Sequence, residues 1–191
     1  MILCGIDEAG RGPLAGPVVA AGIIVKPGLR IEGIRDSKKL NHRQREYLYD
    51  KIIEQAMYYD IQAVSEKTID EINILKSCMS GMEKIMRKLK GSCDLFVIDG
   101  NYLKFENDRH LEYKYETIVK GDDKVYEVSC ASILAKVTRD RMMIEYDCVY
   151  PDYGFKENKG YGTKRHIESI IKHGPCEIHR KTFLRNITAD V

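Results

Sequence analysis

Residues 2–25 read ILCGIDEAGRGPLAGPVVAAGIIV, and this stretch decides the fold. Residues 2–7 are a short apolar run that ends in a carboxylate, a pattern that predicts a strand. Residues 18–25 are too uniformly apolar for a half-exposed strand, so we expect a second strand that is buried on both faces. The glycines and prolines between the two runs favour a turn. The stretch therefore predicts a hairpin whose first strand ends at two acidic residues.

Beyond the hairpin, the spacing of apolar residues predicts helices and strands in alternation. Asn41 is a candidate N-cap for a helix that runs to about Met57, and residues 58–64 read as a strand. Thr68 and Glu71 fit a capping box in which Thr68 is the N-cap. The helix that follows carries apolar residues at spacings of three and four, as an amphipathic helix does. This stripe consists of Ile72, Leu75, Met79, Met82, Met86 and Leu89.

The second half of the chain continues the alternation. Residues 94–99 predict a buried strand, and residues 114–120 predict another. A long helix is expected over residues 129–146. A further helix is expected near residues 164–173, inside a segment that is rich in turns. No repeat, low-complexity segment or linker is visible.

The length of 191 residues predicts one α/β domain over residues 1–191, with residues 150–191 as a helical, basic extension packed on it. The chain has 31 Lys and Arg against 29 Asp and Glu, and this near balance excludes a polybasic protein that binds by bulk electrostatics. No stretch approaches the ~20 apolar residues of a membrane span, and the N-terminus does not resemble a signal peptide.

The six cysteines are scattered along the chain. Their spacing matches neither a zinc site nor a disulfide framework. Free thiols in a reducing cytoplasm are therefore expected.

Carboxylates stand where three of the predicted strands end. Asp7 and Glu8 end the first strand, Asp99 ends the fourth, and Asp122 lies in the turn after the fifth. If the first and fourth strands are neighbours, Asp7 and Asp99 lie close together at one edge of the sheet. Close carboxylates repel each other unless a cation lies between them, and carboxylate oxygens suit Mg²⁺ or Mn²⁺. The cluster therefore predicts a site for one or two divalent metal ions.

A plainer interpretation of the same acids stays open. An Asp at a strand end is often a turn former or a helix cap. Regular alternation also sends Asp7 and Glu8 to opposite faces of the sheet, so the turn must distort the backbone if both are to reach one site. Asp123 adjoins Asp122, and position alone does not decide which of the two faces the site.

Two smaller features are weaker signals. Residues 10–16, GRGPLAG, match neither glycine pattern of nucleotide-binding loops, but their glycines let backbone amides approach a ligand closely, with Arg11 nearby. His166, His173 and His179 do not have the spacing of a zinc site, and we expect surface or capping roles for them.

The last third of the chain is basic. Residues 156–185 contain eight Lys or Arg and three acidic residues, a local charge of +5. Tyr153, Phe155 and Tyr161 are interleaved with the first part of this run. Basic residues among aromatic ones suit contacts to phosphates and stacking on a base or sugar. The alternative is a solvated helix face beside aromatic residues of the core.

Taken together, these segments resemble the ribonuclease HII family in its bacterial form. The resemblance begins with Gly5–Val18 and continues in order along essentially the whole chain. The other matching segments are Asp36–Leu40, Ile98–Asn101, Lys120–Asp122, Ala131–Asp140, Lys159–Thr163, His173–Pro175 and His179–Phe183. The resemblance implies a ribonuclease H-like fold, with a central mixed five-stranded sheet that is flanked by helices on both faces.

The same resemblance implies an endonuclease that hydrolyses the RNA strand of RNA–DNA hybrids. It would also nick duplex DNA on the 5′ side of a single embedded ribonucleotide, leaving 3′-hydroxyl and 5′-phosphate ends. Catalysis would use two metal ions, Mg²⁺ or Mn²⁺. The positions that match the family's metal-binding acids are Asp7, Glu8, Asp99 and Asp122. The positions that match its substrate-binding residues are Gly10, Arg11, Gly12 and Tyr161, which recognise the ribose 2′-hydroxyl and the junction with the next deoxynucleotide, and Lys38, a candidate phosphate contact.

Two other functions stay open. A ribonuclease HIII-like enzyme would cut long hybrids but not a lone ribonucleotide, although the substrate-binding extension usual in that type has no counterpart before Asp7. A non-catalytic module would bind hybrids through the basic segment without needing a divalent ion. Residues 182–187 lack the paired aromatic residues of a sliding-clamp motif, so we expect no clamp docking through that end. A monomer is the default expectation.

Overall fold

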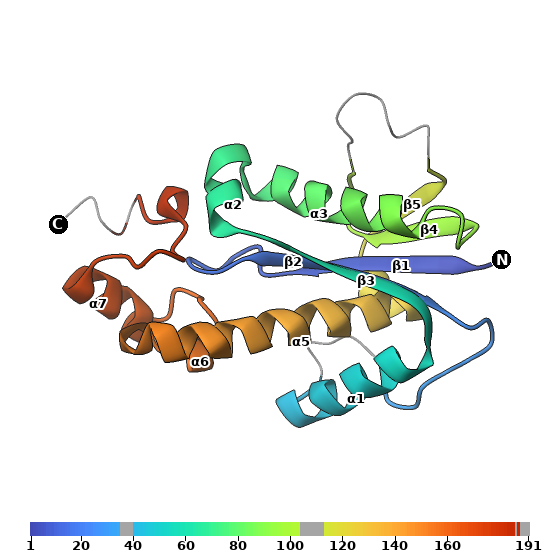
Figure 1. Ribbon diagram of the computed structural model, residues 1–191, viewed down its shortest axis with the longest axis horizontal. Helices are drawn as coiled ribbons and strands as arrows, with labels where there is room; N and C mark the ends of the chain where they lie inside the picture. The colour runs from blue at the N-terminus through green and yellow to red at the C-terminus, as the bar shows by residue number, and fades with distance from the viewer. Residues whose placement is uncertain (35–39, 104–112, 186, 188–191) are drawn as a thin grey trace.

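The chain folds around one mixed β-sheet (Figure 1). The computed structural model describes residues 1–34, 40–103, 113–185 and 187. The strands are β1 (Leu3–Ala9), β2 (Val18–Val25), β3 (Ala56–Val64), β4 (Leu95–Asp99) and β5 (Tyr115–Ile118), and their order in the sheet is β3-β2-β1-β4-β5. β2 pairs antiparallel with β1 and β3, and β4 pairs parallel with β1 and β5. The predicted hairpin and the mixed five-stranded sheet are confirmed.

Helices cover both faces of this sheet. They are α1 (His42–Gln55), α2 (Glu66–Ile72), α3 (Ile74–Leu89), α4 (Gly121–Lys124), α5 (Tyr126–Val149), α6 (Phe155–Asn158) and α7 (Lys164–His173), with the short 3-10 turns η3 (Pro151–Tyr153) and η4 (Lys181–Phe183). Figure 1 shows α2 and α3 on one face of the sheet and α1 and α5 on the other. Within the described residues, no helix has both the length and the apolar character that a membrane span requires.

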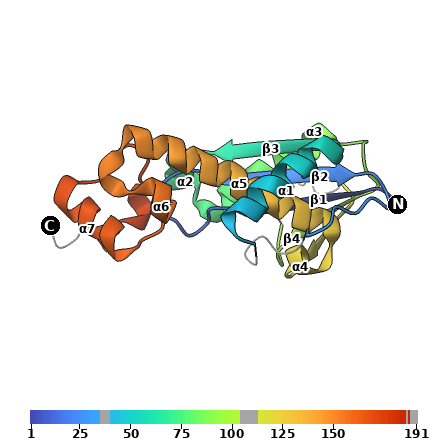
Figure 2. The same cartoon turned by 90° about the horizontal axis from the view of Figure 1, so that it is seen from below.

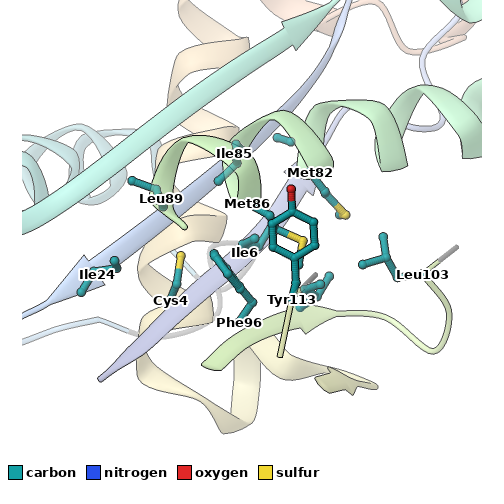
Figure 3. Close-up of a cluster of buried hydrophobic side chains, with 12 residues drawn as sticks. Cys4, Ile6, Ile24, Met82, Ile85, Met86, Leu89, Phe96, Leu103 and Tyr113 are labelled. Atoms are coloured by element: carbon teal, nitrogen blue, oxygen red, sulfur yellow. The ribbon is translucent and has the colours of Figure 1, made fainter. Parts of the chain in front are cut away.

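Each face of the sheet has its own apolar core, because every residue of β2 is buried. Under α3, side chains of Ile6, Ile24, Ile85, Met86 and Phe96 pack together (Figure 3). On the opposite face, β2 packs against α1 and α5. The largest buried side chains of that second core are Ile23, Leu40, Leu48, Ile52, Ile133 and Leu134. Burial of these side chains on both faces is the main source of stability for the sheet.

The helix expected after Thr68 is two helices. The N-cap of α2 is Ser65, whose hydroxyl accepts a hydrogen bond from the amide of Thr68, so the prediction of Thr68 as N-cap is wrong. Asn73 interrupts the helical run with a φ of 70°, and its side chain caps α3. The predicted stripe is buried at Met82, Met86 and Leu89. Leu75 is exposed, because it lies in the first turn of α3, beyond the core.

The other predicted boundaries lie within a few residues of the observed ones. Asn41 is the N-cap of α1, as predicted; it forms a capping box with Gln44, and the helix ends at Gln55. α5 begins at Tyr126, three residues before the predicted start, and α7 has the predicted bounds. The predicted strand over residues 114–120 is shorter, since β5 ends at Ile118.

Two adjacent glycines set how closely helices approach the centre of the sheet. Gly5 lies beside Ile23, and Gly22 lies beside Ile6, in the antiparallel ladder of β1 and β2. A Cβ on Gly5 would lie less than 3.0 Å from backbone atoms of α5, at its first turn. A Cβ on Gly22 would meet Ile85 on the opposite face just as closely. The absence of a side chain at Gly5 therefore fixes the position of α5 over β1.

The C-terminal segment, residues 150–185, packs around the end of α5. Figures 1 and 2 show α6 and α7 together at the end of the molecule toward which β1 points. The loop between β1 and β2 lies against this segment, because the amide of Leu14 donates to Gly160 and the amide of Arg180 donates to Leu14, each at 2.8 Å. An apolar cluster joins the same parts of the chain. It contains Ala15, Met143, Tyr153, Phe155, Ile170, Ile178 and Leu184.

Candidate functional site

A cavity of about 280 Å³, here called the acidic cavity, opens at the carboxyl end of β1. Its walls come from the ends of β1 and β4, from α5, and from the loops after β1 and α6. The lining residues are Asp7, Glu8, Ala9, Gly10, Arg11, Gly12, Asp99, Ser132, Lys136 and Tyr161. All the predicted site residues are in this lining except Asp122, which follows Gly121, a hydrogen-bond partner of Asp99, and Lys38, which lies outside the described residues.

Asp7 is the most buried acid of the cavity, with 5% of its surface exposed. Burial raises the pKa of Asp7 well above its ordinary value, and the nearby charges of Glu8 and Asp99 raise it further. Two hydrogen bonds act in the opposite direction, one from the Ser132 hydroxyl and one from the Glu8 amide, which lies 2.7 Å from Asp7 Oδ1. A buried carboxylate beside two other acids has a strong electrostatic preference for a cation or a proton.

Asp7 and Glu8 line one cavity without any distortion of the strand. Pairing of β1 with β2 is regular through Asp7, Glu8 and Ala9, so the expected backbone distortion is wrong. The reason lies on the other edge of β1, where pairing with β4 ends at Ile6. Beyond that point none of the described strands covers this edge, and side chains from both faces of β1 reach the open space.

One hydrogen bond ties Asp99, at the end of β4, to Gly121, the residue before Asp122. Asp99 ends β4, which runs parallel to β1, so the predicted proximity of Asp7 and Asp99 is confirmed. The amide of Gly121 donates to Asp99 Oδ1 at 2.6 Å and ties the start of α4 to the end of β4. Asp122 follows directly and is 4% exposed, whereas Asp123 faces solvent. Of the two adjacent acids, Asp122 is therefore the buried one.

The donor set of the acidic cavity fits a hard divalent cation. Carboxylate oxygens are the ligands that Mg²⁺ and Mn²⁺ prefer. A cation among the acids would also offset the repulsion that raises the pKa of Asp7. In the described part of the chain, no three His, Cys, Asp or Glu side chains are arranged as a group that could hold a metal ion. Asp7, Glu8 and Asp99 instead face a shared open space.

Tyr161 lines the cavity from the loop after α6, and a buried histidine pair supports it. Tyr161 is 45% exposed, so its ring is available to a ligand. Its carbonyl accepts a hydrogen bond from His166 Nδ1 at 2.8 Å, which leaves His166 Nε2 to accept from His179 Nε2 at 3.0 Å. The amide of Cys176 donates to His179 Nδ1 at 2.9 Å and completes the chain of bonds.

The expected surface or capping role is wrong for two of the three histidines. His166 and His179 are 0% and 2% exposed, whereas His173 is exposed as predicted. Burial lowers the pKa of His166, and burial together with the neighbouring His166 lowers the pKa of His179 to about 4. Both rings are therefore neutral near pH 7, as the pattern of hydrogen bonds requires.

The basic segment has fewer available groups than the sequence suggests. Tyr153 and Phe155 are buried core residues that stack at 5.5 Å, so they are not a stacking surface for a ligand. Arg180 is fully buried. Arg165 pairs with Glu157 at 3.0 Å. The exposed cations of the segment are Lys156, Lys164, Arg165, Lys172, Lys181 and Arg185.

Two lining residues, Ser132 and Lys136, have no role in the sequence-based prediction. They lie four residues apart on one face of α5, in a stretch whose other residues are largely buried and apolar. Ser132 hydrogen-bonds to Asp7, and the ammonium of Lys136 pairs with Asp140. Two polar residues at this spacing in a buried helix were the signal that could have revealed them.

Comparisons with known proteins agree along nearly the whole chain. The sequence profile described as ribonuclease HII matches residues 4–186. The ribonuclease HII of Francisella philomiragia subsp. philomiragia is 50% identical over 183 residues, which are 96% of this chain and 96% of that protein. The ribonuclease HII of Caldicellulosiruptor saccharolyticus is 48% identical over 185 residues, which are 97% of this chain and 88% of that protein. In the solved structure of the PCNA:RNase HII complex from Archaeoglobus fulgidus, the similar chain has a TM-score of 0.79 and 27% identity, with 94% of each chain covered.

Proposed function

The chain belongs to the ribonuclease HII family and is a metal-dependent endoribonuclease that acts on RNA–DNA hybrids; we propose that it also nicks duplex DNA on the 5′ side of a single embedded ribonucleotide. The products would carry 3′-hydroxyl and 5′-phosphate ends. One observation carries this proposal. The acids of the cavity, the glycine turn of residues 10–12 and the exposed ring of Tyr161 face the same space. A phosphate and the adjoining sugars can therefore contact all three at once.

We assign Asp7, Glu8, Asp99 and Asp122 as the groups that hold Mg²⁺ or Mn²⁺. When bound, a pair of such ions activates water and offsets the charge of the leaving 3′-oxygen. The carboxylates of this chain orient and bind the cations, and Ser132 orients Asp7 by its hydrogen bond. The burial of Asp7 strengthens its attraction for a cation, because few water molecules screen the carboxylate.

The cations at the rim complement the acids. Arg11 reaches Glu8 at 3.3 Å while its side chain remains largely exposed, and Lys136 lines the same cavity. These positive groups would contact the phosphates that flank the cut and keep them near the acidic centre. Lys38 is proposed as a further phosphate contact.

Recognition of the ribonucleotide rests on its 2′-hydroxyl, the group that distinguishes RNA from DNA. Gly12 has open space around its α-carbon on the cavity side, apart from the Tyr161 ring at 3.8 Å from the position of a Cβ. The backbone of residues 10–12 can therefore approach a sugar closely. The Tyr161 ring would stack on the following deoxyribose, where an additional hydroxyl would not fit. Residues 150–191 would form the part of the domain that binds the duplex.

A nicking assay with four duplexes tests this function. The duplexes are all-DNA, DNA with one ribonucleotide, DNA with four consecutive ribonucleotides, and a full RNA–DNA hybrid, each with Mg²⁺, Mn²⁺ or EDTA. We expect metal-dependent cutting of every ribonucleotide-containing duplex and one nick on the 5′ side of the single ribonucleotide. Cutting of the hybrid alone would favour the ribonuclease HIII-like alternative. Binding without cutting in either metal would favour a non-catalytic module, and equal cutting of all-DNA duplex would refute the proposal.

A further inference from the structure

Arg180 is a fully buried arginine that lies behind the glycine loop, residues 10–17. Its guanidinium donates to four carbonyl oxygens of that loop: Nη2 to Gly10 at 2.7 Å and to Pro17 at 3.2 Å, Nη1 to Arg11 at 3.0 Å, and Nε to Gly16 at 2.9 Å. The described acidic side chains form no ion pair with Arg180. A charge is costly to bury, so these carbonyl bonds must offset its loss of hydration.

The bonds to Gly10 and Arg11 fix the direction of two peptide groups. A trans peptide is planar, with its N–H pointing opposite to its C=O, and the described chain has no cis peptide. Because the carbonyls of Gly10 and Arg11 point inward at Arg180, the amides of Arg11 and Gly12 must point outward. Arg11 and Gly12 both line the acidic cavity. The side of the loop away from Arg180 is therefore the side of the cavity. Among the described residues, neither amide donates to another protein group.

A positive charge on the carbonyl side also strengthens these donors. A peptide whose oxygen accepts a charge-assisted bond is polarised, and its N–H becomes a better donor. Burial lowers the pKa of Arg180 to about 10, which leaves the guanidinium charged at neutral pH. The two amides are thus oriented and polarised before any ligand arrives.

We propose that Arg180 is a positioning residue for ribonucleotide recognition, which turns the amides of Arg11 and Gly12 toward the cavity so that both donate to the 2′-hydroxyl oxygen. The inference rests on the proposed function, because it names the group that reads the sugar in that site. It also explains why an arginine stands at this place, since its planar fork reaches two successive carbonyls at once, whereas a lysine would reach one.

The test measures how binding discriminates between sugars, in the absence of divalent ions so that no cutting occurs. The dissociation constant is measured by fluorescence anisotropy for two duplexes that differ only in one 2′-hydroxyl. For the wild type we expect the ribonucleotide duplex to bind roughly tenfold more tightly, as two net hydrogen bonds allow. For Arg180→Lys we expect the two dissociation constants to agree within about twofold, while the constant for the all-DNA duplex stays near the wild-type value.

Asp70→Asn is the matched control, because Asp70 anchors the same segment without touching the glycine loop. Its carboxylate accepts from the amides of Lys181 and Thr182 at 2.8 and 3.0 Å. We expect this variant to melt at a lower temperature with the wild-type ratio of dissociation constants. A loss of the ratio in Asp70→Asn as well would show that general order of the segment, and not the Arg180 fork, governs recognition, and would overturn the proposal.

An experiment on the wild-type protein keeps the proposal testable if Arg180→Lys does not fold. In ¹⁵N-labelled protein, the amide resonances of Arg11 and Gly12 should shift more with the ribonucleotide duplex than with the all-DNA duplex. Equal shifts, or a wild-type ratio of one, would overturn the role of these amides. Metal-dependent nicking by the same wild-type sample is scored separately, so a failure of this inference is distinguishable from a failure of the proposed function.

Discussion

Gly5→Ala is expected to reduce catalysis much more than it reduces the stability of the fold, because α5 packs against β1 at Gly5. The added Cβ would lie less than 3.0 Å from the backbone of Glu127 and Val128, whereas ordinary contact begins at 3.4 Å. Backbone atoms cannot rotate away as a side chain can. The first turn of α5 must therefore move off the strand by a distance of the order of 1 Å.

This displacement acts on the site directly. α5 carries Ser132, which bonds to Asp7, and α4 with Asp122 leads straight into it. Overpacking of this kind costs about 1–3 kcal/mol, and the loss of a flexible glycine from the unfolded chain returns about 0.4–1 kcal/mol. A misplacement of ~1 Å among reacting groups costs about 100-fold in rate. We expect Gly5→Ala to be modestly less stable and to lose about 100-fold in kcat/KM.

Gly22→Ala is the matched control, since Gly22 lies in the neighbouring strand and faces the other way. Its Cβ would press on the buried Ile85 of α3, which carries no residue of the acidic cavity. Both variants are unfolded in urea at 25 °C and assayed for nicking under folded conditions. Similar losses of stability with a large loss of kcat/KM only in Gly5→Ala are expected. If Gly5→Ala keeps kcat/KM within about threefold of Gly22→Ala, the close approach of α5 does not set the geometry of the site.

Substitutions at three further positions, two of them with a matched control, test individual parts of the account. Asp99→Asn should reduce nicking by at least about 100-fold with little change in substrate binding, because a metal-binding carboxylate is lost; retained turnover would remove Asp99 from the centre. Tyr161→Ala should lower kcat/KM by about 10- to 100-fold through lost stacking, whereas Tyr161→Phe should stay close to wild type; equal effects of the two variants would exclude stacking. His179 has a pKa of about 4 in the folded protein against about 6.5 when unfolded, so the unfolded state binds more protons in that window and stability falls as pH decreases through it. Urea unfolding at pH 7 and pH 5 should therefore show a loss of at most about 2 kcal/mol that His179→Gln reduces and the exposed His173→Gln does not; an unchanged loss in His179→Gln would refute this origin.

Much of the architecture could be predicted because local patterns and global packing agree. The uniformly apolar residues 18–25 required a covered strand, and Asn41 could be predicted as a helix N-cap from the sequence. The break at Asn73 could not be read in the same way. The apolar stripe continues across it, so only the observed backbone, with a φ of 70°, shows that two helices meet there.

The candidate site likewise has parts that the sequence could predict and parts that it could not. Acids at strand ends are visible in the sequence, and the adjacency of β1 and β4 brings Asp7 and Asp99 together. Burial of polar groups by distant segments is not visible. His166 and His179 meet only because α7 and the following loop fold together, and Arg180 contacts carbonyls about 170 residues earlier in the chain. In the sequence, Arg180 counts among the basic residues suited to phosphate contacts, whereas in the structure its side chain is fully buried.

The central claim is that the acids at the end of β1 form a divalent-cation site, and thermal unfolding with and without Mn²⁺ tests it most directly. At constant ionic strength and Mn²⁺ at about ten times its Kd, linkage stabilises the folded protein by ~1.4 kcal/mol, which raises its Tm by roughly 3–6 °C. We expect this rise in the wild type and in Asp123→Asn, whose side chain faces solvent. In Asp7→Asn, one buried charge is removed, so Tm without metal should be higher and its response to Mn²⁺ should be lost. An Asp7→Asn protein that responds to Mn²⁺ as the wild type does would contradict the assignment of this site.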